Sequence, residues 1–150
     1  MLWTIILAFA LATSAILVAM RVGGPPERAA ARILVMMLVT PWIVSLLGGK
    51  TFSSVDPTAF ATDLLALIGF VLIALTANRY WPLWVSSCQL LSVAAHLIRW
   101  LDINVEPLVY AVMSGGPSYA ISLLVLAGAL NYRRRQRTGD ERLSHNFSVP

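Results

Sequence analysis

Charged residues are scarce in this sequence. Asp, Glu, Lys and Arg make up 12% of its 150 residues, about half of the roughly 25% that is usual in soluble globular chains. Hydrophobic residues instead make up 58%. A soluble chain of this length has too little interior to bury so much apolar surface, whereas a lipid bilayer removes the need to bury it. The composition therefore excludes a soluble globular domain and predicts a polytopic membrane protein.

Cysteine and lysine are almost absent, and each absence excludes a class of function. Cys88 is the only cysteine, so neither an intrachain disulfide nor a cysteine-based metal cluster can form. Lys50 is the only lysine and lies between apolar runs, which excludes a retinal Schiff base inside a helix. The sequence also lacks the motifs of P-loop nucleotide binding, of serine hydrolases and of zinc proteases. We therefore expect no catalytic residues, no metal site and no enzymatic activity.

An all-α bundle of five transmembrane helices is the predicted fold, with helices at about 2–20, 26–49, 60–77, 81–100 and 107–132. Each apolar run approaches the roughly 20 helical residues that cross a bilayer. The first run has no Lys or Arg before it and is longer than the apolar part of a signal peptide, so we interpret it as a retained span. Residues 1–132 would then form one transmembrane domain, followed by a basic, partly disordered cytoplasmic tail at 133–150.

Lys and Arg predict the orientation of the helices, because they accumulate in loops on the cytoplasmic side of a membrane. Five spans place the first connection, the third connection and the tail on one side. Those segments carry nine arginines: Arg21, Arg28, Arg32, Arg79, Arg133, Arg134, Arg135, Arg137 and Arg142. The other side carries Lys50 and Arg99. The sequence thus predicts an N-terminus outside and a C-terminus inside.

The basic run after the fifth predicted span indicates a contact with lipid. Net charge is +4, but the positive residues flank apolar runs, so we expect no nucleic-acid partner. Basic residues next to a span attract anionic lipids at the cytoplasmic face. The residues predicted to form this membrane-surface anchor are Arg133, Arg134, Arg135 and Arg137.

The first predicted span carries four alanines on one helical face, because they recur at spacings of three and four residues. They are Ala8, Ala12, Ala15 and Ala19. Small residues let membrane helices approach closely. This helix-packing face either docks another subunit or packs against the other helices of the chain. The second interpretation is favoured, since small residues line most contacts between membrane helices.

The stretch "MSGGPSY" lies inside the fifth predicted span and predicts a kink or a break. Pro117 lacks a backbone donor, and Gly115 with Gly116 loosens the preceding turn. Broken helices of transporters bind substrates through their exposed backbone. Such a site would also involve polar residues of the fourth span: Ser86, Gln89 and Ser92. A structural kink is favoured, because Pro and Gly are common in ordinary membrane helices.

His96 lies inside an apolar run, four residues after Ser92 in "SVAAH". An ionisable residue within a span is a candidate functional site. A small residue one turn before a histidine resembles the pigment-ligating motif of bacterial light-harvesting polypeptides, which implies that His96 binds or adjoins bacteriochlorophyll. However, His96 lies only about four residues, or roughly 6 Å, inside the outer boundary. At that depth a histidine with a structural hydrogen bond is the favoured interpretation.

The third and fourth spans are joined by a very short connection, so we predict that they pack as an antiparallel hairpin. Asp63 and His96 are equally far in sequence from the middle of that connection and should lie at the same depth. Arg99 lies one turn beyond His96 on roughly the same face and should extend to the outer interface. Pairing would offset the cost of desolvating these groups. We therefore predict a polar clasp in which Asp63 contacts His96, Arg99 or both.

The stretch "ANRYWPLWVSSCQLLSVAAHLIRWLD", residues 77–102, resembles short multi-pass membrane proteins of alphaproteobacteria. The resemblance covers the third connection and the fourth span. It implies a bacterial inner-membrane protein, and neither an activity nor a site residue follows from it.

Three functions remain open on the sequence. The first is a non-enzymatic accessory or scaffold subunit of a larger membrane complex with other transmembrane subunits, which is favoured by the small size and the alanine face. The second is a pigment-associated subunit of a photosynthetic complex, with bacteriochlorophyll at His96. The third is a small oligomeric transporter or channel.

Overall fold

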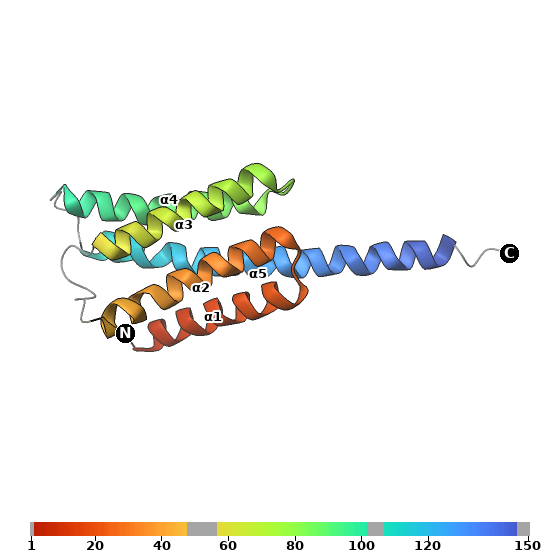
Figure 1. Ribbon diagram of the computed structural model, residues 1–150, viewed down its shortest axis with the longest axis horizontal. Coiled ribbons are helices and arrows are strands. Elements are labelled where there is room, and N and C mark those ends of the chain that lie inside the picture. Colours follow the sequence, from red (N-terminus) through yellow and green to blue (C-terminus); the bar gives the residue numbers. More distant parts are fainter. Residues whose placement is uncertain (1, 48–56, 102–106, 147–150) are drawn as a thin grey trace.

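The computed structural model describes residues 2–47, 57–101 and 107–146, and these residues form five α-helices (Figure 1). The helices are α1 (Leu2–Val22), α2 (Pro25–Leu46), α3 (Pro57–Thr76), α4 (Trp81–Trp100) and α5 (Pro107–Asn146). The predicted all-α class is therefore confirmed. Within the described residues, α2, α3 and α4 are each long and apolar enough to cross a membrane, and the apolar part of α1, Ile6–Val22, is shorter.

Two hairpins and one long helix make up the bundle. α1 pairs with α2 and α3 pairs with α4, while α2 packs against α3. α5 packs against both α1 and α4 and also touches α2, so the five helices close into a ring. Both hairpin turns lie at the same end of the bundle, and α5 continues past that end (Figure 1). We call this end the turn end.

The turn between α1 and α2 is Gly23–Gly24, and packing explains both glycines. A Cβ atom at Gly23 would lie 2.4 Å from the Ala19 carbonyl oxygen, and one at Gly24 would lie 2.8 Å from the Tyr132 ring. Two prolines then begin α2 at Pro25, where the missing N–H of proline costs nothing because the first helical N–H groups have no partner in the helix.

Small residues fill the centre of the bundle and permit close helix approach. The fully buried members are Ala15 and Ala19 of α1, Ala30 and Ala31 of α2, Ala66 of α3, Val85 of α4, and Val125 and Ala129 of α5. Large apolar side chains instead face outward, as with Leu7 at 63% and Leu75 at 77% exposed. An apolar exterior over a small-residue interior is what a lipid-facing bundle requires.

The fifth helix extends past the predicted span. α5 continues beyond residue 132 to Asn146 as one helix. Pro117 lies inside α5 and is buried, so the helix is continuous there, and the favoured kink at Gly115, Gly116 and Pro117 stays a prediction. A Cβ atom at Gly115 would meet nothing within 4 Å, so close packing does not demand glycine there.

Candidate functional site

Buried polar side chains gather in two clusters, one toward each end of the bundle. The first, which we call the Asp63 cluster, consists of Asp63, Gln89 and His96. His96 Nε2 lies 3.1 Å from Asp63 Oδ2, and each side chain is 18% exposed. An ionised carboxylate only accepts hydrogen bonds, so in the ionised form of Asp63 this contact requires the tautomer of His96 that carries a proton on Nε2.

Gln89 completes the Asp63 cluster from α4. Its side chain is fully buried, and its Nε2 donates to the backbone oxygen and to Oδ1 of Asp63, each at 3.1 Å. The transporter hypothesis included Gln89 in its site; in the structure Gln89 donates to Asp63. Its Oε1 is buried and has no hydrogen-bond partner within the described part of the chain.

Aromatic rings cover the Asp63 cluster. Phe60 stands edge-on to the His96 ring at a centroid distance of 6.3 Å and packs on Trp100 at 4.9 Å. Arg99 lies one turn beyond His96 and is exposed. The structure thus brings Asp63 of α3 and His96 of α4 together. The Phe60 ring lies beside His96, and the Trp100 ring lies beside Phe60.

The contact with Asp63 also bears on the pigment hypothesis. A pigment metal binds a neutral imidazole nitrogen through its lone pair. His96 Nε2 points at Asp63, so a metal would be ligated by the other ring nitrogen, Nδ1, which keeps its lone pair in the tautomer that donates through Nε2.

The second cluster, the Glu27 cluster, lies at the turn end and was missed by the sequence analysis. Glu27 has no exposed side-chain surface, and its Oε1 accepts from Arg79 Nη1 at 2.9 Å and from Trp81 Nε1 at 3.2 Å. Arg79 in turn lies over the Tyr132 ring, 5.0 Å from its centroid. Glu27 therefore joins α2 to the α3–α4 turn, and Arg79 extends the contact to α5.

Packing at the turn end is tight around this cluster. A Cβ atom at Gly128 would lie 3.1 Å from the Trp81 ring, and one at Gly24 would lie 3.0 Å from Glu27 Oε2. That oxygen is buried and has no hydrogen-bond partner among the described residues. A side chain at Gly24 would therefore crowd the Glu27 carboxylate, and one at Gly128 would crowd the Trp81 ring that donates to it.

The remaining sites predicted from the sequence divide between the interior and the surface. Within the alanine face, Ala15 and Ala19 are fully buried between α1 and its neighbours, whereas Ala8 and Ala12 are half-buried. Ser86 donates to the Pro82 carbonyl oxygen at 2.9 Å, within its own helix. Ser92 is buried. The basic anchor residues are exposed on α5: Arg133, Arg134, Arg135 and Arg137.

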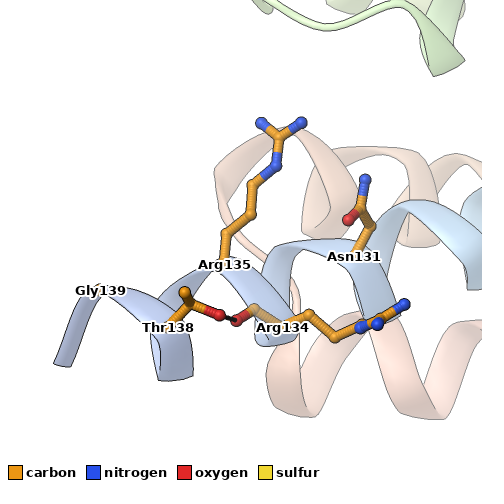
Figure 2. Close-up of a pocket in the computed structure, with 5 residues that line it drawn as sticks. All are labelled: Asn131, Arg134, Arg135, Thr138 and Gly139. Atoms are coloured by element: carbon orange, nitrogen blue, oxygen red, sulfur yellow. Dashed lines mark hydrogen bonds between the residues drawn. The ribbon is translucent and has the colours of Figure 1, made fainter. Parts of the chain in front are cut away.

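A shallow hollow of about 460 Å³, open to solvent, lies along α5 just past the turn end (Figure 2). Its lining residues are Asn131, Arg134, Arg135, Thr138 and Gly139. Thr138 Oγ1 donates to the Arg134 carbonyl oxygen at 3.1 Å. The Arg134 and Arg135 side chains extend away from the helix, the first back toward the bundle and the second outward (Figure 2).

Comparisons of the chain with protein-family models, with curated proteins and with solved structures found no match. Over the residues that the structure describes, the chain is an all-α bundle with three helices of membrane-spanning length.

Proposed function

We propose that this chain is a non-enzymatic integral membrane protein that serves as an accessory or scaffold subunit of a larger membrane complex. In this proposal all five helices span the inner membrane of a bacterium, with the N-terminus outside and the turn end in the cytoplasm.

The observation that carries the proposal is how the two polar clusters are used. Asp63 and Glu27 each hold a side chain from another helix or turn. A buried carboxylate is costly in a low-dielectric interior unless it is paired. These pairs therefore serve to fix the helices relative to one another, which is what a rigid scaffold needs.

The arrangement of the turns supports the proposed orientation. The α1–α2 turn, the α3–α4 turn and the extension of α5 lie at one end of the bundle (Figure 1). Arg21, Arg28 and Arg79 belong to the turns or their flanks, and the basic run of α5 begins at the same end. One end thus gathers the positive residues that the positive-inside rule assigns to the cytoplasm.

The outer surface supports contact with other subunits as well as with lipid. Trp42 is 63% exposed and Trp84 is 65% exposed, each on a helix of membrane-spanning length. Large aromatic side chains are enriched both at membrane interfaces and at the contacts between proteins.

Native co-purification tests the proposal. The full chain with a C-terminal tag is extracted in a mild detergent, and the complex is sized and its subunits identified. We expect a discrete assembly in which another membrane protein is present in fixed stoichiometry. A homogeneous monomer that retains no other subunit after extraction into lipid nanodiscs would contradict the scaffold proposal, and a visible absorption band would favour the pigment-associated subunit instead.

A further inference from the structure

The face of α5 that lines the hollow has the spacing of a single helical surface. Asn131 and Thr138 are each three or four positions from both Arg134 and Arg135, whereas the two arginines are adjacent, so the four side chains form one broad face of the helix. Two of them are arginines, which are exposed. We call residues 131, 134, 135 and 138 the hollow face.

The hollow face continues an apolar stripe of the same helix. Leu123 is 54% exposed and Leu130 is 45% exposed, and they are seven residues apart, which is two helical turns. Arg134 follows Leu130 by four residues and therefore lies about one turn farther along α5, toward its C-terminus, on the same side of the helix. In a bilayer the stripe contacts acyl chains, so Arg134 lies at the level where headgroups begin.

The groups in the hollow suit a phosphate. Arg134 and Arg135 carry guanidinium groups, and a guanidinium group can bind phosphate oxygens through two parallel hydrogen bonds. The two side chains extend in different directions in the structure (Figure 2), so they would turn toward one another to share a phosphate. The Asn131 amide adds a neutral donor. The Thr138 hydroxyl proton is already donated to the Arg134 carbonyl oxygen, so Thr138 shapes the hollow without donating to a ligand.

We propose that the hollow face binds the phosphate headgroup of one anionic membrane lipid where α5 leaves the bundle. The inference rests on the proposed function in one respect, namely that the bundle spans a bilayer with its turn end at a headgroup layer. It goes further in naming a defined site on one side of α5, in place of a diffuse attraction between the whole basic run and the membrane.

The chain offers a matched control for this site. Arg133 and Arg137 belong to the same basic run and are exposed, as Arg134 and Arg135 are, but they do not line the hollow. They are four residues apart and share a different face of α5. Replacing Arg134 and Arg135 by Gln, or Arg133 and Arg137 by Gln, removes the same charge from the same helix.

The experiment titrates phosphatidylglycerol onto the full-length protein in neutral detergent and counts bound lipids by native mass spectrometry. Phosphatidylcholine and inorganic phosphate serve as comparison ligands. We expect R134Q/R135Q to weaken binding of the first phosphatidylglycerol at least about tenfold, or roughly 1.4 kcal/mol. R133Q/R137Q should weaken it less than about threefold. Unchanged melting temperatures for both variants would show that the bundle is intact.

Equal losses in the two double variants would overturn the site, because diffuse attraction depends only on charge. Equal affinity for phosphatidylcholine would also overturn it. Displacement of the lipid by inorganic phosphate at matched concentration would assign the hollow to a free anion and overturn the lipid proposal. The titration in detergent depends neither on the orientation of the chain nor on a partner subunit, so its failure is distinguishable from failure of the proposed function.

Discussion

At the scale of single residues, Glu27 has the most demanding environment in the described structure. Its side chain is fully buried, and Oε1 holds both Arg79 and Trp81. Glu27→Ala should lower the free energy of unfolding by about 2–4 kcal/mol, because it leaves Arg79 and the Trp81 N–H without their acceptor. The neighbouring Arg28 is exposed, and Arg28→Ala should change stability by less than about 0.5 kcal/mol. Reversible unfolding in mixed micelles measures both, and equal effects would contradict the structural role of Glu27.

The Asp63–His96 contact should appear as coupling in a double-mutant cycle. Interhelical hydrogen bonds in membrane proteins average about 0.6 kcal/mol and reach about 1.7 kcal/mol. Asp63→Asn combined with His96→Ala should therefore fall short of additivity by about 0.5–1.5 kcal/mol. Ser87 of α4 is exposed and donates to the Leu83 carbonyl oxygen, so Asp63→Asn with Ser87→Ala is the additive control. Thermal unfolding of the four proteins in each cycle measures the coupling, and full additivity in both cycles would mean that Asp63 and His96 do not interact.

The two clusters differ in how far the sequence could predict them. Asp63 and His96 belong to one hairpin, and the short connection fixes which residues of α3 and α4 are level. Glu27 and Arg79 belong to different hairpins. Their contact depends on how α2 packs beside α3 and α4, and no spacing along the chain encodes that packing. Glu27 also lies in the first turn of α2. The helix dipole favours an acidic residue at that position, so its presence in the sequence did not indicate a buried ion pair.

At the scale of the elements, the end of a helix could be predicted where an apolar run stops at residues that favour turns. Gly23–Gly24 separates α1 from α2, whose first residues are two prolines, and α4 begins at Trp81 as predicted. The end of α5 was not predictable in this way. Past Tyr132 the apolar run stops, but Arg and Gln have high helix propensity, so the helix continues while the membrane signal ends. Composition identifies the span, whereas propensity decides how far the helix extends.

The α1–α2 turn gives a prediction that depends on space alone. The backbone of Gly24 is in an ordinary extended conformation, with φ at −77°, so an added methyl group causes no backbone strain. It would however lie 2.8 Å from Tyr132 Cε2. Gly24→Ala should therefore cost about 1–3 kcal/mol through overpacking.

Gly139 provides the matched control for Gly24. It lies within α5, and a Cβ atom there would meet nothing within 4 Å. Gly139→Ala should be neutral or stabilise helix α5 by up to about 1 kcal/mol. Unfolding of each variant in mixed micelles measures the global stability, and circular dichroism reports the helix content. A Gly24→Ala protein as stable as the unmodified chain would contradict the close approach of Tyr132 to the turn.

At the scale of the whole molecule, the proposed orientation in the membrane rests on which segments share an end. The α1–α2 turn, the α3–α4 turn and the α5 extension share the turn end (Figure 1), so they must lie on one side of any bilayer that the bundle crosses. Arginines concentrate there, whereas α2 ends and α3 begins at the other end (Figure 1), with Phe52 between them in the sequence. The proposal that the turn end is cytoplasmic applies the positive-inside rule to this distribution.

Two reporters test this orientation, one active only in the cytoplasm and one active only outside it. Each is fused after Phe52, after Tyr80 or after Pro150. We expect the cytoplasmic reporter to be active after Tyr80 and after Pro150, and the other to be active after Phe52. Fusions after Tyr80 and Pro150 act as mutual controls, since the structure puts both segments at the turn end. If these two fusions report opposite sides, α5 does not cross the bilayer together with the two hairpins. If all three positions report the reverse pattern, the five helices still span, but the arginines at the turn end do not determine the direction of insertion.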